Sequence, residues 1–258
     1  MSESPLWLNL LLSGPNPDRW KLVRETVSHA LPKDEGLTIF VSADELEEAR
    51  EAFATDRYTV AEWTISDGAM EFSEPLSEEE GNLLIYGRPD FPDDLMDALI
   101  SGFRAEHFEM GRIVTHVHCG WCEKTEEAKA WFEGCIHFSD LVLLDARHEV
   151  EDAWVRDFQE KYRKLRYPCH FDLVRKNLPK HPQWFFDSQP RRLSLVFDPD
   201  DLSGLGGEEY EIEGDPPDEE DDPEAAGDPY LRRNAAGERE RKVRPLPFAL
   251  DGSTDSEK

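Results

Sequence analysis

The residue types best able to do chemistry gather in one stretch, Gly111 to Ala146. It holds three of the four cysteines and three of the eight histidines. Cys119 and Cys122 are two residues apart, and two thiolates at that spacing can bind one soft metal ion. Tetrahedral zinc needs two further ligands, which His118, Cys135 and His137 could supply. A zinc site is therefore one interpretation of this stretch; apart from zinc, no cofactor is expected.

The same cysteine pair permits a second chemistry. The pair lies between a predicted strand and a predicted helix, and a helix amino terminus lowers a thiol pKa. In a dithiol oxidoreductase Cys119 would attack and Cys122 would resolve the mixed disulfide. A third interpretation is structural, with Cys119 and Cys135 as small buried residues and the histidines as caps or packing groups. All three interpretations stay open on the sequence alone.

Other chemical signals are weaker. Asp140 and Asp145 flank the apolar run Leu141 to Leu144, where solvated strand ends are a simpler interpretation than a carboxylate pair. The sequence contains no G-x-S-x-G, H-E-x-x-H or G-x-G-x-x-G pattern. The usual signatures of serine hydrolases, zinc proteases and dinucleotide-binding enzymes are therefore absent.

The elements that must position these residues alternate between short apolar runs and segments with helical periodicity. Because the runs are apolar throughout, they indicate strands buried on both faces. We therefore predict an α/β fold with three layers, a mostly parallel sheet with helices on both faces, and sites at the carboxyl ends of its strands. The expected strands are Leu6–Leu12, Gly36–Val41, Tyr58–Trp63, Asn82–Tyr86, Ile113–Val117, Leu141–Leu144, Cys169–Val174 and Arg192–Phe197. The expected helices start near Pro17 and Pro92 and cover about Asp44–Phe53, Glu123–Phe132 and Val150–Leu165.

Composition divides the chain into three parts. Residues 1–197 carry the strand and helix patterns and are expected to form one globular domain. Residues 198–230 hold fifteen acidic residues and no lysine or arginine, and predict a disordered acidic linker. Residues 231–258 are expected to be a mostly disordered basic arm and tail. The arm, with six basic residues from Arg232 to Arg244, could bind an acidic partner or RNA, or fold back onto the acidic body.

The formal net charge of -28 repels phosphate backbones, so nucleic-acid binding by the whole protein is not expected outside that arm. The amino-terminal apolar run Leu6–Leu12 is too short for a signal peptide and has no basic residue before it. No run approaches the roughly eighteen apolar residues of a membrane helix. We expect a cytoplasmic protein with a protein partner that the sequence does not identify.

The order of these segments resembles the CobW-type metal-chaperone GTPases, a branch of the P-loop NTPases, over roughly Leu6 to Leu173. The segments LWLNLLLSGPNPDRWKLV, LLIYGRPDFPDDLMDALI, RIVTHVHC and CIHFSDLVLLDAR stand in the family's order. The resemblance implies a P-loop NTPase-like fold with a first phosphate-binding loop and a later guanine-reading strand end.

The family's functional residues are not found at the matching positions. The phosphate-binding Gly, Lys and Ser or Thr would fall at Arg19, Trp20 and Lys21. Asp145-Ala146-Arg147 replaces the guanine-reading Asn-Lys-x-Asp, and the family's Cys-x-Cys-Cys metal motif is absent. We therefore expect a non-catalytic binding or regulatory protein with a degenerate P-loop-like core. Zinc binding and dithiol oxidoreductase activity are the alternatives.

Overall fold

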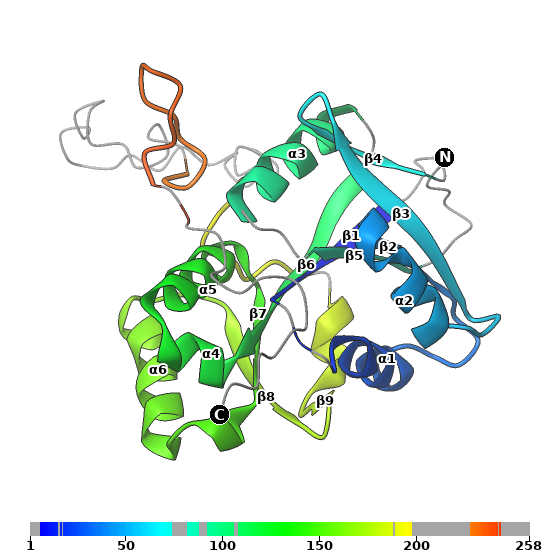
Figure 1. Ribbon diagram of the computed structural model, residues 1–258, viewed down its shortest axis with the longest axis horizontal. Coiled ribbons are helices and arrows are strands. Elements are labelled where there is room, and N and C mark those ends of the chain that lie inside the picture. The colour runs from blue at the N-terminus through cyan, green and yellow to red at the C-terminus, as the bar shows by residue number, and fades with distance from the viewer. Residues whose placement is uncertain are drawn as a thin grey trace, which may run out of the picture.

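A nine-stranded sheet forms the centre of the computed structural model (Figure 1), with strand order β4-β3-β2-β5-β1-β6-β7-β8-β9. The structure describes residues 6–14, 16, 18–73, 82–87, 92–105, 108–187, 189–197, 228–241 and 243. The seven inner strands of that order are parallel to one another; they are β3, β2, β5, β1, β6, β7 and β8. Of the described strands, only the edge strands β4 and β9 pair antiparallel. The predicted mostly parallel sheet is confirmed.

The elements follow one another as a repeated strand and helix. The strands are β1 (Leu6–Ser13), β2 (Leu37–Val41), β3 (Tyr58–Ser66), β4 (Ala69–Phe72), β5 (Asn82–Gly87), β6 (Phe108–His118), β7 (Leu141–Asp145), β8 (His170–Arg175) and β9 (Leu178–Pro179). The α-helices are α1 (Arg19–Ala30), α2 (Leu46–Ala52), α3 (Pro92–Ala105), α4 (Cys119–Lys124), α5 (Glu126–Phe138) and α6 (Asp152–Lys164). The 3₁₀ helices are η1 (Ala43–Glu45), η3 (Arg147–Glu149) and η4 (Pro182–Phe186).

Two apolar cores, one on each face of the sheet, explain the three layers. Helices α3, α4, α5 and α6 bury residues such as Leu95, Trp131 and Phe158 against one face. Helices α1 and α2 and the 3₁₀ helix η4 cover the other face, with Trp20 and Phe185 among the buried side chains. This division follows from the central strands, whose side chains are buried on both faces and need a cover on each.

Several predicted boundaries differ from the structure. Arg192–Phe197 is not a strand, because it pairs with no strand of the described sheet. Its leucines Leu193 and Leu195 are exposed, and the polar side chains of Arg192 and Ser194 are buried against the body of the protein. Strand β4 was not predicted; it is only four residues long and lies at the sheet edge. The predicted helix after β6 is two helices, because Thr125 adopts an extended conformation and caps α5 through its side chain.

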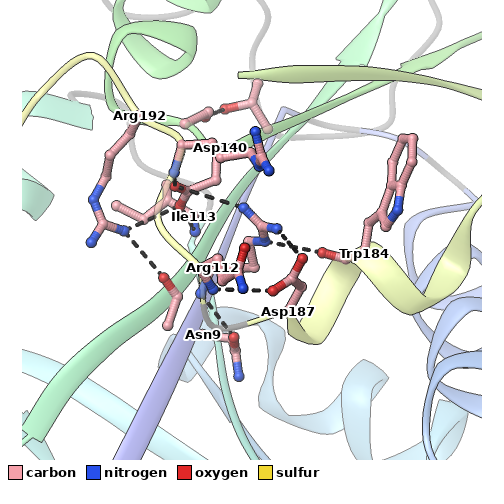
Figure 2. A network of polar contacts seen from close by, with 12 residues as sticks. Asn9, Arg112, Ile113, Asp140, Trp184, Asp187 and Arg192 are labelled. Atoms are coloured by element: carbon pink, nitrogen blue, oxygen red, sulfur yellow. Dashed lines mark hydrogen bonds and ion pairs between the residues drawn. The ribbon is translucent and has the colours of Figure 1, made fainter. Parts of the chain in front are cut away.

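A buried polar network ties the chain after β9 to the sheet (Figure 2). Asp140, fully buried just before β7, accepts hydrogen bonds from the backbone N–H of Ile113 at 2.8 Å and from Nη1 of Arg192 at 3.1 Å. Arg112 donates to the carbonyl oxygen of Trp184 at 3.2 Å and pairs with Asp187 at 2.7 Å. The prediction of a solvated strand end at Asp140 is therefore wrong.

Residues 228–241 and Val243, here called the strap, fold back onto α3 and α5; they include the orange segment of Figure 1. Arg239 is 7% exposed and lies 2.9 Å from Asp93, 2.6 Å from Asp94 and 2.7 Å from Asp97. Tyr230 is buried with its ring centroid 4.7 Å from that of His137. Part of the predicted basic arm is thus docked on the acidic body. The linker segment 198–227 and the tail 244–258 lie outside the described residues.

None of the described helices has the length and apolar character needed to cross a membrane.

Candidate functional site

A cavity opens at the carboxyl edge of the sheet, where sites of such folds are expected. Strands β1, β6, β7 and β8 are neighbours, so the segments that follow them meet at this edge. The cavity has a volume of about 470 Å³. Its lining residues are Asn16 and Asp18 after β1, His118 of β6, Asp145, Ala146, Arg147, His148 and Glu149 at the end of β7, and Val174, Arg175, Lys176 and Asn177 around the β8–β9 turn.

Below the cavity, three polar side chains form a hydrogen-bonded chain across the strands. Ser13 and His116 are register partners on β1 and β6, so their side chains leave the same face of the sheet. Nδ1 of His116 lies 3.1 Å from Oγ of Ser13, and Nε2 lies 3.1 Å from Oδ2 of Asp145. Burial raises the pKa of Asp145, but the hydrogen bond and electrostatic attraction from His116, together with the backbone N–H of Ala146 and the nearby His118, hold that pKa below its usual value.

This chain has the residue types of a hydrolase triad but not its arrangement. Ser13 is fully buried and directs its hydroxyl proton to the carbonyl oxygen of Gly14 at 3.0 Å. A nucleophilic serine instead presents its hydroxyl to substrate and passes its proton to the histidine. We therefore assign the Ser13, His116 and Asp145 chain a structural role, in which it orients Asp145 at the cavity floor. The sequence alone gave no sign of this chain, because its members are far apart along it.

The residues at which the resemblance would place a phosphate-binding loop make contacts within the protein itself. Nε of Arg19 lies 3.1 Å from Oε1 of Glu45, and its Nη2 pairs with Glu48. Nη1 of Arg19 donates to the carbonyl oxygen of Asn16 at 3.1 Å. Each guanidinium nitrogen thus has a partner within the chain.

Trp20, the next residue, packs into the core instead of facing the cavity. It is 5% exposed, and its ring centroid lies 4.5 Å from that of Tyr86 and 6.0 Å from that of Phe53. Tyr86 itself is fully buried. The first turn of α1 is therefore part of the core.

Cys119 and Cys122 lie at the start of α4, as predicted, but both are buried in the apolar core. Burial raises the pKa of each thiol to about 12, which overrides the effect of the helix amino terminus. The depressed pKa that the dithiol interpretation requires is not found at Cys119. A dithiol oxidoreductase needs an accessible thiolate, so these two observations count against that alternative.

His118 caps α4 and lines the cavity. Its Nδ1 accepts the backbone N–H of Trp121 at 3.4 Å, and the two rings stack at 4.3 Å. Its Nε2 lies 3.6 Å from Oε1 of Glu149. Burial lowers the pKa of His118, which favours the neutral ring that these contacts use.

The two remaining residues of the predicted zinc set lie on α5. Cys135 is fully buried in the core, and burial raises its pKa well above the ordinary value. Nε2 of His137 lies 2.8 Å from Oδ2 of Asp228, in the contact with the strap. Within the described ranges, no group of three or more His, Cys, Asp or Glu side chains is arranged to hold a metal ion. The zinc site stays a prediction.

Comparisons with known proteins identify two similar solved structures. No protein-family model matches the sequence, and no curated protein matches it. The Zn(II)-bound YjiA GTPase from E. coli is 12% identical with a TM-score of 0.38, and a Zn(II)-bound triple mutant of YjiA is 11% identical with a TM-score of 0.42. Each match covers 73% of this chain and 67% of the other. The structure of this chain is thus similar to that of the YjiA GTPase over about three quarters of its length.

Proposed function

We propose that this protein is a non-catalytic binding module whose P-loop-like core does not bind nucleotide. The observation that carries the proposal is that the first turn of α1 is occupied by contacts within the protein. Phosphate-binding loops offer free backbone N–H groups and a lysine to the phosphates. Here Arg19 is held by Glu45 and Glu48, and Trp20 is buried against Tyr86.

Two features support binding over catalysis. The cavity at the carboxyl edge of the sheet gives room for a small ligand. The polar chain beneath it has no exposed nucleophile, since Ser13 is fully buried. Zinc binding at the cysteine and histidine stretch is the second candidate, and metal content measured on the purified protein tests it.

Thermal unfolding with and without nucleotide tests the proposal. A nucleotide that binds the native state at one hundred times its dissociation constant stabilises it by about 2.7 kcal/mol. For a chain of this size that corresponds to a rise in Tm of about 5 °C or more. We expect no rise with magnesium-GTP or magnesium-ATP relative to magnesium chloride alone. A nucleotide-dependent rise of that size would contradict the proposal.

A further inference from the structure

Three basic residues of the cavity wall distinguish it from the rest of this acidic protein. Arg147 follows β7, Arg175 ends β8, and Lys176 begins the β8–β9 turn. Among the residues that the structure describes, their side chains have no hydrogen bond or ion pair. The protein as a whole carries a formal net charge of -28. Three cations without a partner in the described chain therefore lie around one cavity.

Arg147 also contains a polar atom that the fold leaves without a partner. Its Nε is buried and makes no hydrogen bond within the described chain. Buried donors are nearly always satisfied in folded proteins, by protein or by a bound group.

The acidic residues of the wall are mostly compensated from within the protein. Asp145 accepts a hydrogen bond from His116 at 3.1 Å and from the backbone N–H of Ala146 at 2.7 Å. Glu149 lies 3.4 Å from Nζ of Lys124. Asp18, the third carboxylate of the wall, is exposed to solvent, as are Arg175 and Lys176, so solvent screens all three charges. The three basic side chains of the wall, by contrast, have no partner within the described chain.

The backbone of the wall contains several positive φ angles. Five described residues other than glycine have a positive φ, and Ala146, Lys176 and Asn177 are three of them. All three line the cavity. Lys176 and Asn177 are the two central residues of the β8–β9 hairpin turn, where a positive φ at both positions is the ordinary geometry of a type I′ turn. These backbone conformations place the basic side chains of Arg147, Arg175 and Lys176 around one opening.

We propose that this cavity binds a small oxyanion, a carboxylate or phosphate group, through Arg147, Arg175 and Lys176. The inference rests on the proposed function, because it names the class of ligand that the binding module takes. Arginine presents planar pairs of N–H donors that match two oxygens of a carboxylate or phosphate. Lys176 adds a point charge at the rim.

Calorimetric titration with inorganic phosphate and with malonate, at constant ionic strength, tests the proposal on the full chain. We expect saturable binding of at least one of the two ions below about 10 mM. Saturation by phosphate alone or by malonate alone identifies which oxyanion the site prefers. Titrations that show no saturable heat with either ion would overturn the proposal.

Substitutions in the cavity wall test whether the ion binds in the cavity. Arg147→Gln and Lys176→Asn each remove one charge, and asparagine tolerates the positive φ at position 176. We expect each to weaken binding by about tenfold, the effect of losing one charge-assisted hydrogen bond. The matched control is Arg156→Gln on α6, an exposed position outside the cavity, which should leave the affinity unchanged. Equal losses in all three variants would overturn the assignment, since they would show general charge attraction.

The titrations with small ions and with nucleotides test the inference and the proposed function separately. Oxyanion binding without nucleotide binding supports both. An absence of binding by phosphate and malonate refutes only the inference. Binding of magnesium-GTP or magnesium-ATP refutes the proposed function, whatever the small ions do. If Arg147→Gln does not fold, Arg175→Gln replaces it with the same expected loss.

Discussion

At the residue scale, Asp140 shows how much one side chain can organise. Its carboxylate satisfies the backbone of Ile113 and Arg191 and the guanidinium of Arg192. Burial raises the pKa of Asp140, and the nearby Arg192 and Arg112 oppose that rise. No local pattern marks this residue in the sequence, because its contacts lie 27 and 52 positions away. Its hydrogen bonds form only when the folded sheet brings those distant segments together.

We predict that Asp140→Ala lowers the free energy of unfolding by about 3–5 kcal/mol, because it leaves buried arginine charges without their partner. Urea denaturation measures the loss. Asp157→Ala, on the exposed side of α6, is the control and should change stability by less than about 0.5 kcal/mol. A loss as small as that of the control would show that the network of Figure 2 does not stabilise the fold.

The cysteines give a second test at this scale. All four are buried, and the pKa values of Cys119, Cys122 and Cys169 are raised to about 12. Because the thiolate is the reactive form, the native protein should react slowly with a thiol reagent at pH 8. We expect all four to react only after unfolding in denaturant. One thiol that reacts rapidly in the native protein would contradict this and revive the dithiol hypothesis.

At the scale of elements, the buried strands could be predicted because they are apolar on both faces, as in Leu6–Ser13 and Leu141–Asp145. The strand expected at Arg192–Phe197 failed because tertiary contacts decide such a short segment, and they bury Arg192 and Ser194 instead of the leucines. The cysteine stretch was placed correctly between strand and helix. Its spacing could not show that the thiols point into the core.

The strap is the element whose position the sequence left open. We predict that Arg239→Ala opens it, because the variant loses the contacts to Asp93, Asp94 and Asp97. Trypsin cleavage after Arg232 or Arg233 should then become about tenfold faster, since cleavage follows the population of the open form. Arg156→Ala on α6 is the control. Equal cleavage rates in the variant and the original protein would show that Arg239 does not hold the strap.

At the scale of the whole molecule, the three-layer fold places both candidate regions at the carboxyl ends of parallel strands, and the sequence predicted that edge. The cavity itself could not be predicted, because it combines residues after β1, β6, β7 and β8. The few basic side chains of this acidic protein have distinct places in the structure. Arg239 holds the strap, Arg19 closes the first turn of α1, and the cavity keeps three cations without partners in the described chain.

Calorimetric titration of the full chain with magnesium-GTP and magnesium-ATP tests the central claim most directly, because it measures affinity and stoichiometry together. The contacts of Arg19 with Glu45 and Glu48 and the burial of Trp20 predict no saturable heat with either nucleotide. Binding of one equivalent with a dissociation constant near 1 μM, about -8 kcal/mol, would contradict the claim and show that the first turn of α1 opens to phosphate.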